Sequence, residues 1–177
     1  MKRFEGVVYR AHHPGWAWAP ASGEGAKLHG GRFNPPGMEA LYTSLRPETA
    51  WLEAQQGFAF KAQPMTLCAY RVDCEDVLDL TDAAVLAACG VSAADLACPW
   101  ADLHDRGLPV PSWAVARRLA EAGAAAVLVP SFAPGAVSGR ASMRFSGAGA
   151  IARPTAWWLW TTTGGCRATG DHGPKTR

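Results

Sequence analysis

The sequence carries little charge and has no long hydrophobic run. Charged residues make up 18% of its 177 residues, and 17 basic against 15 acidic side chains give a formal net charge of +2. A dedicated nucleic-acid-binding protein usually has a strongly basic face, so this balance argues against direct nucleic-acid binding. No stretch approaches the roughly 18 apolar residues of a membrane span. No apolar segment follows the basic N-terminus either, so we expect neither a membrane anchor nor a signal peptide.

Patterns typical of disulfide scaffolds and metal sites are also missing. The five cysteines include no C-x-x-C pair, and the five histidines do not follow the spacing of metal ligands. We therefore expect a reduced, cytoplasmic protein without a metal. The sequence does have an excess of arginine over lysine. This excess is a functional hint, because a guanidinium group binds phosphates and carboxylates through two parallel hydrogen bonds.

Turn residues and hydrophobic periodicity predict one domain of the α+β class. We expect strands at residues 6–12, 40–44, 65–72, 77–80, 124–129, 140–145 and 157–162. We expect four helices: one at residues 47–56, one from the cap Thr81 to Gly90, one from the cap Ser92 to a kink near Pro99, and one from the cap Ser112 to Gly123. Residues 14–39 should form a long loop. Strands outnumber helices without βαβ alternation, which indicates a mixed or antiparallel sheet in a single compact domain at 1–162. Residues 163–177 lack an apolar anchor, so we expect a disordered tail.

The candidate chemistry is concentrated between residues 30 and 53. Two glycines open this segment and give a ligand access to the backbone, and Arg32 directly after them can reach an anionic group. A predicted strand then places Tyr42, and the next helix carries Glu53 with only small residues three and four positions away on the same face. The pattern therefore predicts a site with space beside the carboxylate.

Each of these residues also has an ordinary structural explanation. Arg32 can pair with a surface acid, which contributes little to stability. Tyr42 can belong to the core, and Glu53 can be solvated at the helix surface. Ser131, which follows the predicted strand at 124–129, can be a simple turn residue. The order of the residues along the chain is therefore more informative than any one of them.

That order resembles the RES domain, a family named for its Arg, Glu and Ser residues. The resemblance rests on the motifs Y-R-A-H at 9–12, G-G-R-F-N-P-P-G, A-L-Y-T-S, P-E-T-A-x-x-E, and V-L-V-P-S ending at Ser131. It extends over residues 6–146. Residues 138–142 depart from the family pattern, which often has a Gly-Asn pair before a final strand, and the Trp-rich stretch 157–160 lies outside the resemblance.

The resemblance implies a fold similar to that of ADP-ribosyltransferases and an enzyme that consumes NAD⁺ as its substrate without a metal. It implies cleavage of the nicotinamide–ribose bond, with ADP-ribose passing to water, phosphate or a protein side chain. Carried over by position, Arg10 and Arg32 bind the pyrophosphate or the adjacent ribose, and Tyr42 stacks on the nicotinamide ring. Glu53 stabilises the positive charge that develops on the ribose, and Ser131 hydrogen-bonds the ribose or the carboxamide. Glu53, Arg32 and Ser131 are thus the expected catalytic residues.

The resemblance also implies a biological setting. Members are the toxins of RES–Xre toxin–antitoxin modules, so we expect growth arrest, an Xre-like antitoxin as partner, and a cellular protein as one of the acceptors. We hypothesise that Trp16 and Trp18 contribute to the antitoxin interface. Two alternatives remain open: a non-enzymatic module that binds protein, or nucleic acid by stacking on tryptophan, and a structural scaffold protein.

Overall fold

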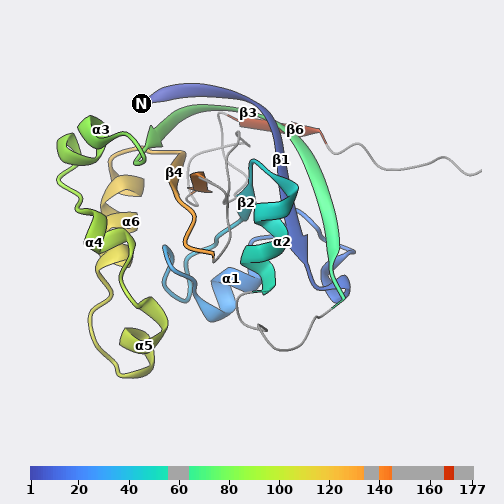
Figure 1. Ribbon diagram of the computed structural model, residues 1–177, viewed down its shortest axis with the longest axis horizontal. Coiled ribbons are helices and arrows are strands. Elements are labelled where there is room, and N and C mark those ends of the chain that lie inside the picture. Colours follow the sequence, from blue (N-terminus) through green and yellow to red (C-terminus); the bar gives the residue numbers. More distant parts are fainter. Residues whose placement is uncertain (56–63, 134–139, 145–165, 170–177) are drawn as a thin grey trace, which may run out of the picture.

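The fold is organised around a long antiparallel pair of strands, β1 (Lys2–His12) and β3 (Thr66–Asp79), which cross the molecule together (Figure 1). The computed structural model describes residues 1–55, 64–133, 140–144 and 166–169, with side chains in the first two ranges. Burial along β3 alternates, so that Tyr70 and Val72 face the core whereas Arg71 is exposed. This period of two is typical of a strand with one face on the core.

The remaining strands close the sheet into a ring. They are β2 (Tyr42–Ser44), β4 (Ala126–Pro130), β5 (Arg140–Arg144) and β6 (Cys166–Thr169). The strand order is β1-β2-β5-β4-β3-β6, and β1 also pairs with β3, so five strands form a closed circuit and β6 is added outside β3. Among the strands that the structure describes, only β3 and β4 pair in parallel, and the residues of β4 from Ala126 to Val129 are buried. The structure therefore confirms a mixed sheet in an α+β domain.

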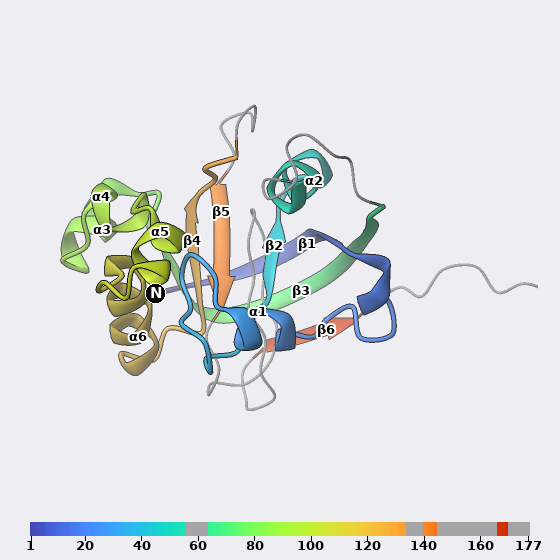
Figure 2. The same ribbon diagram turned by 90° about the horizontal axis from the view of Figure 1, so that it is seen from below.

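Short helices surround this sheet. They are α1 (Glu24–His29), α2 (Pro47–Gln55), α3 (Ala83–Ala88), α4 (Ala93–Leu96), α5 (Trp100–Asp105) and α6 (Pro111–Glu121), with a 3₁₀ turn at Pro14–Trp16. Helices α3 to α6 lie together on the side of β4, and α2 stands apart from them against β1 and β2 (Figures 1 and 2). Helix α6 buries Val115 and Leu119 in the core, and burying a side chain of that size stabilises the fold by roughly 2 kcal/mol.

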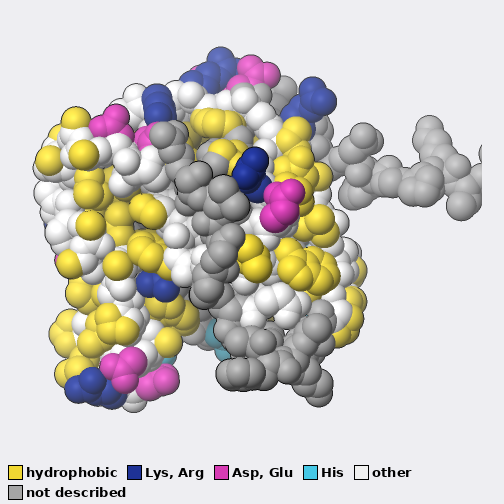
Figure 3. Space-filling view, in the orientation of Figure 1, with side chains coloured by type: hydrophobic (Ala, Val, Ile, Leu, Met, Phe, Trp, Pro, Cys, Tyr) yellow, Lys and Arg dark blue, Asp and Glu magenta, His cyan; other side chains and the backbone are white. Residues whose placement is uncertain are grey.

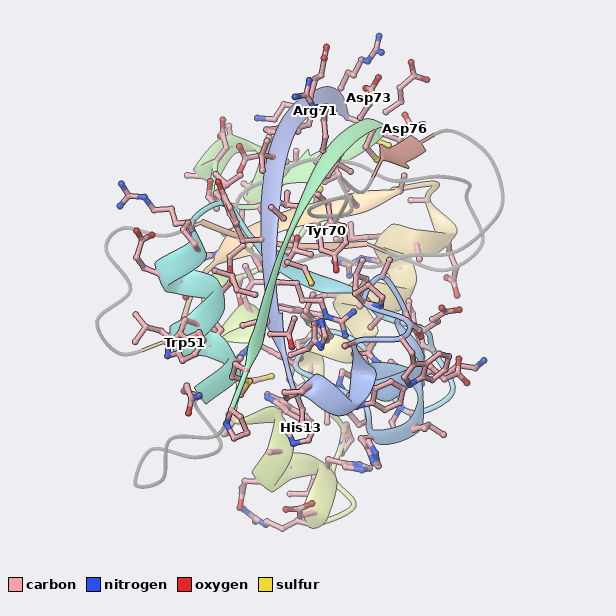
Figure 4. All side chains as sticks on the ribbon, turned by 90° about the vertical axis from the view of Figure 1, so that its right-hand side faces the viewer. His13, Trp51, Tyr70, Arg71, Asp73 and Asp76 are labelled. Carbon is pink, nitrogen blue, oxygen red and sulfur yellow. The ribbon has the colours of Figure 1, made fainter. Side chains whose placement is uncertain are left out.

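Charged and hydrophobic side chains are unevenly distributed over the face of the molecule seen in Figure 3. Charged side chains gather over the outer end of α5, where Arg106 pairs with Asp102 at 3.1 Å, whereas hydrophobic side chains are widespread over the neighbouring helices (Figure 3). Asp73 and Asp76 lie at one end of the β1–β3 pair, His13 lies at the opposite end and Tyr70 between them (Figure 4). Within the described residues, no helix is long and apolar enough to cross a membrane.

Several sequence-based expectations about the elements need correction. The strands expected at 65–72 and 77–80 fall on one continuous strand, β3 (Thr66–Asp79), because pairing with β1 carries the backbone through the acidic stretch between them. The expected loop at 14–39 contains α1, a helix of six residues that is too short for a periodic pattern. Part of the expected disordered tail forms β6 on the edge of β3. The predicted strand at 157–162 lies outside the described residues.

Two helix caps and one cysteine also differ from expectation. Asp82, not Thr81, caps α3, because its carboxylate accepts hydrogen bonds from the first turn. Helix α6 begins at Pro111, and the Ser112 hydroxyl bonds to Arg32 instead of capping the helix. Cys74 is disulfide-bonded, so the expectation of a fully reduced chain is wrong at this position; Cys68, Cys89 and Cys98 are free thiols.

Candidate active site

A cavity of about 390 Å³ brings together residues from six parts of the fold: β1, α1 with the turn after it, β2, α2, α5 and the end of β4. Four of the five side chains predicted from the sequence line it: Arg10 from β1, Arg32 from the turn after α1, Tyr42 from β2 and Glu53 from α2. Ser131, the fifth, follows the lining residue Pro130 at the end of β4. A volume of this size lies within the usual range of ligand pockets.

Arg32 occupies the tip of a tight turn. Gly31 and Asn34 close this turn through backbone hydrogen bonds of 2.9 and 3.4 Å. The guanidinium donates to the backbone carbonyl of Cys98 at 3.0 Å and lies 4.6 Å from the centre of the Phe132 ring. Burial lowers the pKa of Arg32, and the nearby Glu53 carboxylate opposes this shift by favouring the charged form. The turn thus holds a cation in the cavity wall, where partial desolvation strengthens its attraction for an anion.

Glu53 and Ser131 are joined directly. The Ser131 hydroxyl donates a hydrogen bond to a carboxylate oxygen of Glu53, and it accepts one from the backbone N–H of Ala133 at 3.3 Å. Helix α2 therefore carries the Glu53 carboxylate, and Ser131, directly after β4, orients it. Ala50, one turn earlier on α2, is buried against the core, which fixes the rotation of this helix.

Tyr42 points its hydroxyl away from the solvent. The hydroxyl donates to Asn34 Oδ1 at 2.5 Å and accepts from the backbone N–H of Phe33 at 3.1 Å. Burial raises the pKa of Tyr42, so the phenol stays protonated at any physiological pH. The ring, and not the oxygen, is the part of Tyr42 that is available to a ligand.

Arg10 differs from the simple role of a phosphate-binding residue. One of its terminal nitrogens donates to the carbonyls of Pro20 and Ser22, at 2.8 and 2.7 Å. The Tyr70 hydroxyl donates to the same Pro20 carbonyl at 2.8 Å. Burial lowers the pKa of Arg10. Arg10 therefore faces the cavity and at the same time ties the segment before α1 to the β1–β3 pair.

Sequence reasoning missed three residues of this site. Trp100 and Phe132 line the cavity, and Asn34 connects the Arg32 turn to Tyr42. Asn34 lies inside the recognised G-G-R-F-N motif, which was a usable signal, but Trp100 and Phe132 lie far along the chain and carry none. Among the residues that the structure describes, no group of three or more His, Cys, Asp or Glu side chains could hold a metal ion.

Comparisons with known proteins place the chain in a family. The RES domain profile matches residues 7–152. No curated protein has a significantly similar sequence. A solved structure with a similar fold is a chain from the crystal structure of the M. tuberculosis MbcT–MbcA toxin–antitoxin complex, with a TM-score of 0.61 and 20% identity. The match covers 96% of this chain and 86% of that chain. Because the profile covers most of the sequence, this chain belongs to the RES domain family.

Proposed function

We propose that this chain is the toxin of a toxin–antitoxin pair and that its cavity binds NAD⁺ and breaks the nicotinamide–ribose bond. The observation that carries the proposal is the meeting of three side chains that the resemblance singled out: Arg32 and Glu53 line one cavity, and Ser131, beside its lining, hydrogen-bonds Glu53. The fold shared with a chain of a toxin–antitoxin complex supports the biological setting.

The charges of the cavity suit this substrate. Arg10, Arg32 and Glu53 contribute two positive charges and one negative charge, which leaves one net positive charge. NAD⁺ carries two negative charges on its pyrophosphate and one positive charge on nicotinamide, which leaves one net negative charge. The partly buried Arg32 guanidinium can donate to two phosphate oxygens at once, and the ring of Tyr42, a lining residue, can stack on the cationic nicotinamide.

The reaction follows from the same groups. When the bond between C1′ of the ribose and the nicotinamide nitrogen breaks, the electron pair leaves with nicotinamide, which becomes neutral. The ribose carbon is left with a developing positive charge, and the Glu53 carboxylate, held by Ser131, stabilises it electrostatically. An acceptor oxygen or nitrogen then bonds to C1′ and loses its proton. Water gives free ADP-ribose, phosphate gives ADP-ribose phosphate, and a side chain gives a modified protein.

The first experiment is a nicotinamide-release assay on the purified chain with NAD⁺, in buffer alone, with inorganic phosphate and with cell lysate. We expect release with at least one acceptor, and the product identifies which. We expect Glu53→Gln and Arg32→Ala to abolish release. Matched controls are Glu48→Gln on the same helix and Arg46→Ala just before it, both on exposed side chains, which should retain it. Intact NAD⁺ under all three conditions would refute the proposed reaction.

A second experiment tests the setting in cells. Induced expression of the chain should arrest growth, and the Glu53→Gln variant should not. Co-expression of an Xre-like protein encoded beside the toxin should restore growth and co-purify with the chain. Harmless expression of an active enzyme would refute the toxin assignment while leaving the chemistry standing.

A further inference from the structure

We propose that Asn34 is a positioning residue that fixes Arg32 and the Tyr42 ring relative to each other, and that the Tyr42 hydroxyl belongs to this internal frame and makes no contact with substrate. The inference rests on the proposed function, since it concerns how the two predicted NAD⁺-binding side chains are held. It names a residue outside the Arg, Glu and Ser positions of the family.

Asn34 has the environment of a structural clamp. Its side chain is fully buried, at 0% exposure. Its amide nitrogen donates to the carbonyls of Ala26 and Met38, at 2.8 and 2.9 Å, and more weakly to that of Pro35 at 3.3 Å. Its oxygen accepts the Tyr42 hydroxyl proton at 2.5 Å. Because a buried amide with both ends bonded has few alternative orientations, Asn34 locks the end of α1, the following turn and β2 together.

The Tyr42 hydroxyl is held by two hydrogen bonds within the protein. Its one proton goes to Asn34, and its oxygen accepts from the backbone N–H of Phe33. The raised pKa of Tyr42, caused by burial, keeps that proton in place. With its proton donated internally, the hydroxyl cannot act as an acid toward a substrate. The ring is therefore held by its far end, with its apolar body along the cavity.

The turn that carries Arg32 leaves room for the Tyr42 and Asn34 side chains to contact each other. A Cβ atom placed on Gly31 would lie 2.5 Å from the Tyr42 hydroxyl oxygen and 2.8 Å from Asn34 Oδ1, closer than real Cβ atoms come. Only a glycine allows Tyr42 and Asn34 to meet directly behind the turn. The glycine thus has a specific purpose beyond general access to the backbone.

The other side of the turn is held from a distant helix. The Trp113 ring nitrogen donates to the Gly31 carbonyl at 2.7 Å, and the Ser112 hydroxyl donates to the Arg32 carbonyl. With Asn34 and Tyr42 on one side and the first turn of α6 on the other, the backbone of Arg32 has little freedom. Loss of Asn34 removes one of these two supports, so both the guanidinium and the ring should lose their fixed positions.

The first test needs no substrate. Tyr9, Tyr42 and Tyr70 are the three tyrosines of the chain, so their hydroxyl protons can be assigned by NMR with single Phe variants. We expect slow exchange with water for the Tyr42 and Tyr70 protons, because both are hydrogen-bonded, and fast exchange for Tyr9. Asn34→Ala should release the Tyr42 proton and leave that of Tyr70 protected. Fast exchange of the Tyr42 proton in the unaltered chain would overturn the proposal, whether or not the protein cleaves NAD⁺.

The second test is a double-mutant cycle on nicotinamide release, with KM and kcat measured separately. We expect Asn34→Ala to raise the KM for NAD⁺ about tenfold, the scale of one or two lost hydrogen bonds, and Tyr42→Phe to raise it about fivefold. In the Asn34→Ala background, Tyr42→Phe should add much less, because only the bond from the Phe33 backbone N–H to the hydroxyl is then left to lose. An equal cost of Tyr42→Phe in both backgrounds would show that the hydroxyl acts independently of Asn34 and would overturn the proposal.

Two controls separate positioning from general loss of stability. Ser92→Ala removes the capping hydroxyl of α4, outside the cavity lining, and should lower the melting temperature without changing KM. Tyr9→Phe removes a tyrosine hydroxyl outside the cavity lining and should leave the kinetics unchanged. If Ser92→Ala raised KM as much as Asn34→Ala at a similar loss of melting temperature, the effect of Asn34 would be structural only.

Discussion

The bond between Ser131 and Glu53 leads to a quantitative prediction. In Ser131→Ala the carboxylate loses the hydroxyl that orients it, while its charge and its helix remain. A hydrogen bond to a charged group contributes about 1.5–3 kcal/mol. If that contribution is fully expressed when positive charge develops on the ribose, kcat should fall by about tenfold to a hundredfold.

The split between kinetic constants is part of this prediction. In the proposed reaction, Ser131 holds a group that acts on the transition state, whereas Arg32 and Tyr42 hold the bound dinucleotide. Ser131→Ala should therefore lower kcat and leave the KM for NAD⁺ within about twofold. The free energy of unfolding of the variant should lie within about 1 kcal/mol of that of the parent chain, because Glu53 lines an open cavity where water can replace the lost donor.

The assay is steady-state nicotinamide release at saturating NAD⁺, combined with thermal denaturation followed by circular dichroism. Ser92→Ala provides the comparison, because it also removes a serine hydroxyl that bonds to a carboxylate, in this case Asp95 outside the cavity lining. An unchanged kcat in Ser131→Ala, or a loss confined to KM, would show that Ser131 does not act by orienting Glu53.

Two further predictions concern the fold. Gly31→Ala should destabilise the chain by about 2–3 kcal/mol in chemical denaturation, because its Cβ would lie 2.5 Å from the Tyr42 hydroxyl. Gly25→Ala is the control and should fold normally, because its Cβ would meet only Trp16, at 3.8 Å. Equal stability of the two variants would contradict this prediction. Burial raises the pKa of Asp79, but hydrogen bonds including that from Lys2 at 2.8 Å outweigh it, so the net pKa lies below its usual 3.8. The stability that Asp79 contributes is therefore present at neutral pH and lost as the pH falls below about 4. Asp79→Asn should lower the free energy of unfolding at pH 7, and the difference between the variant and the parent chain should narrow in acid. A difference that does not depend on pH would refute this prediction.

Sequence alone predicted the elements that local chemistry determines. Pro47 at the first helical position and Glu48 in the first turn predict α2, and the continuous apolar run of β4 predicts a buried strand. The continuity of β3 was missed because it depends on its register with β1, where Glu5 lies opposite Asp73. Pairing between distant segments overrode the local preference of an acidic stretch for a turn.

The candidate site, like the fold, was predicted from the sequence only in part. The order of motifs identified Arg10, Arg32, Tyr42 and Glu53, and the structure places all four around one cavity, although their roles stay predictions. The dual position of Arg10, bonded to two backbone carbonyls, could not be predicted, because it depends on how the loop that follows β1 folds back. The parts contributed by Trp100 and Phe132 were equally hidden, since nothing in sequence spacing reveals which distant aromatic side chains meet in space.

The ties that hold Arg32 have a consequence for when activity can arise during synthesis. The guanidinium rests on Cys98 and Phe132, and the turn is held by Ser112 and Trp113, all at least 66 positions later in the chain. A nascent chain that has exposed only its first hundred residues already contains Arg10, Arg32, Tyr42 and Glu53. It still lacks Ser112 and Trp113, which hold the Arg32 turn, and Ser131, which bonds to Glu53. Under the proposed function, incomplete chains released from a stalled ribosome should therefore be inactive, and an antitoxin is needed only once translation and folding are complete.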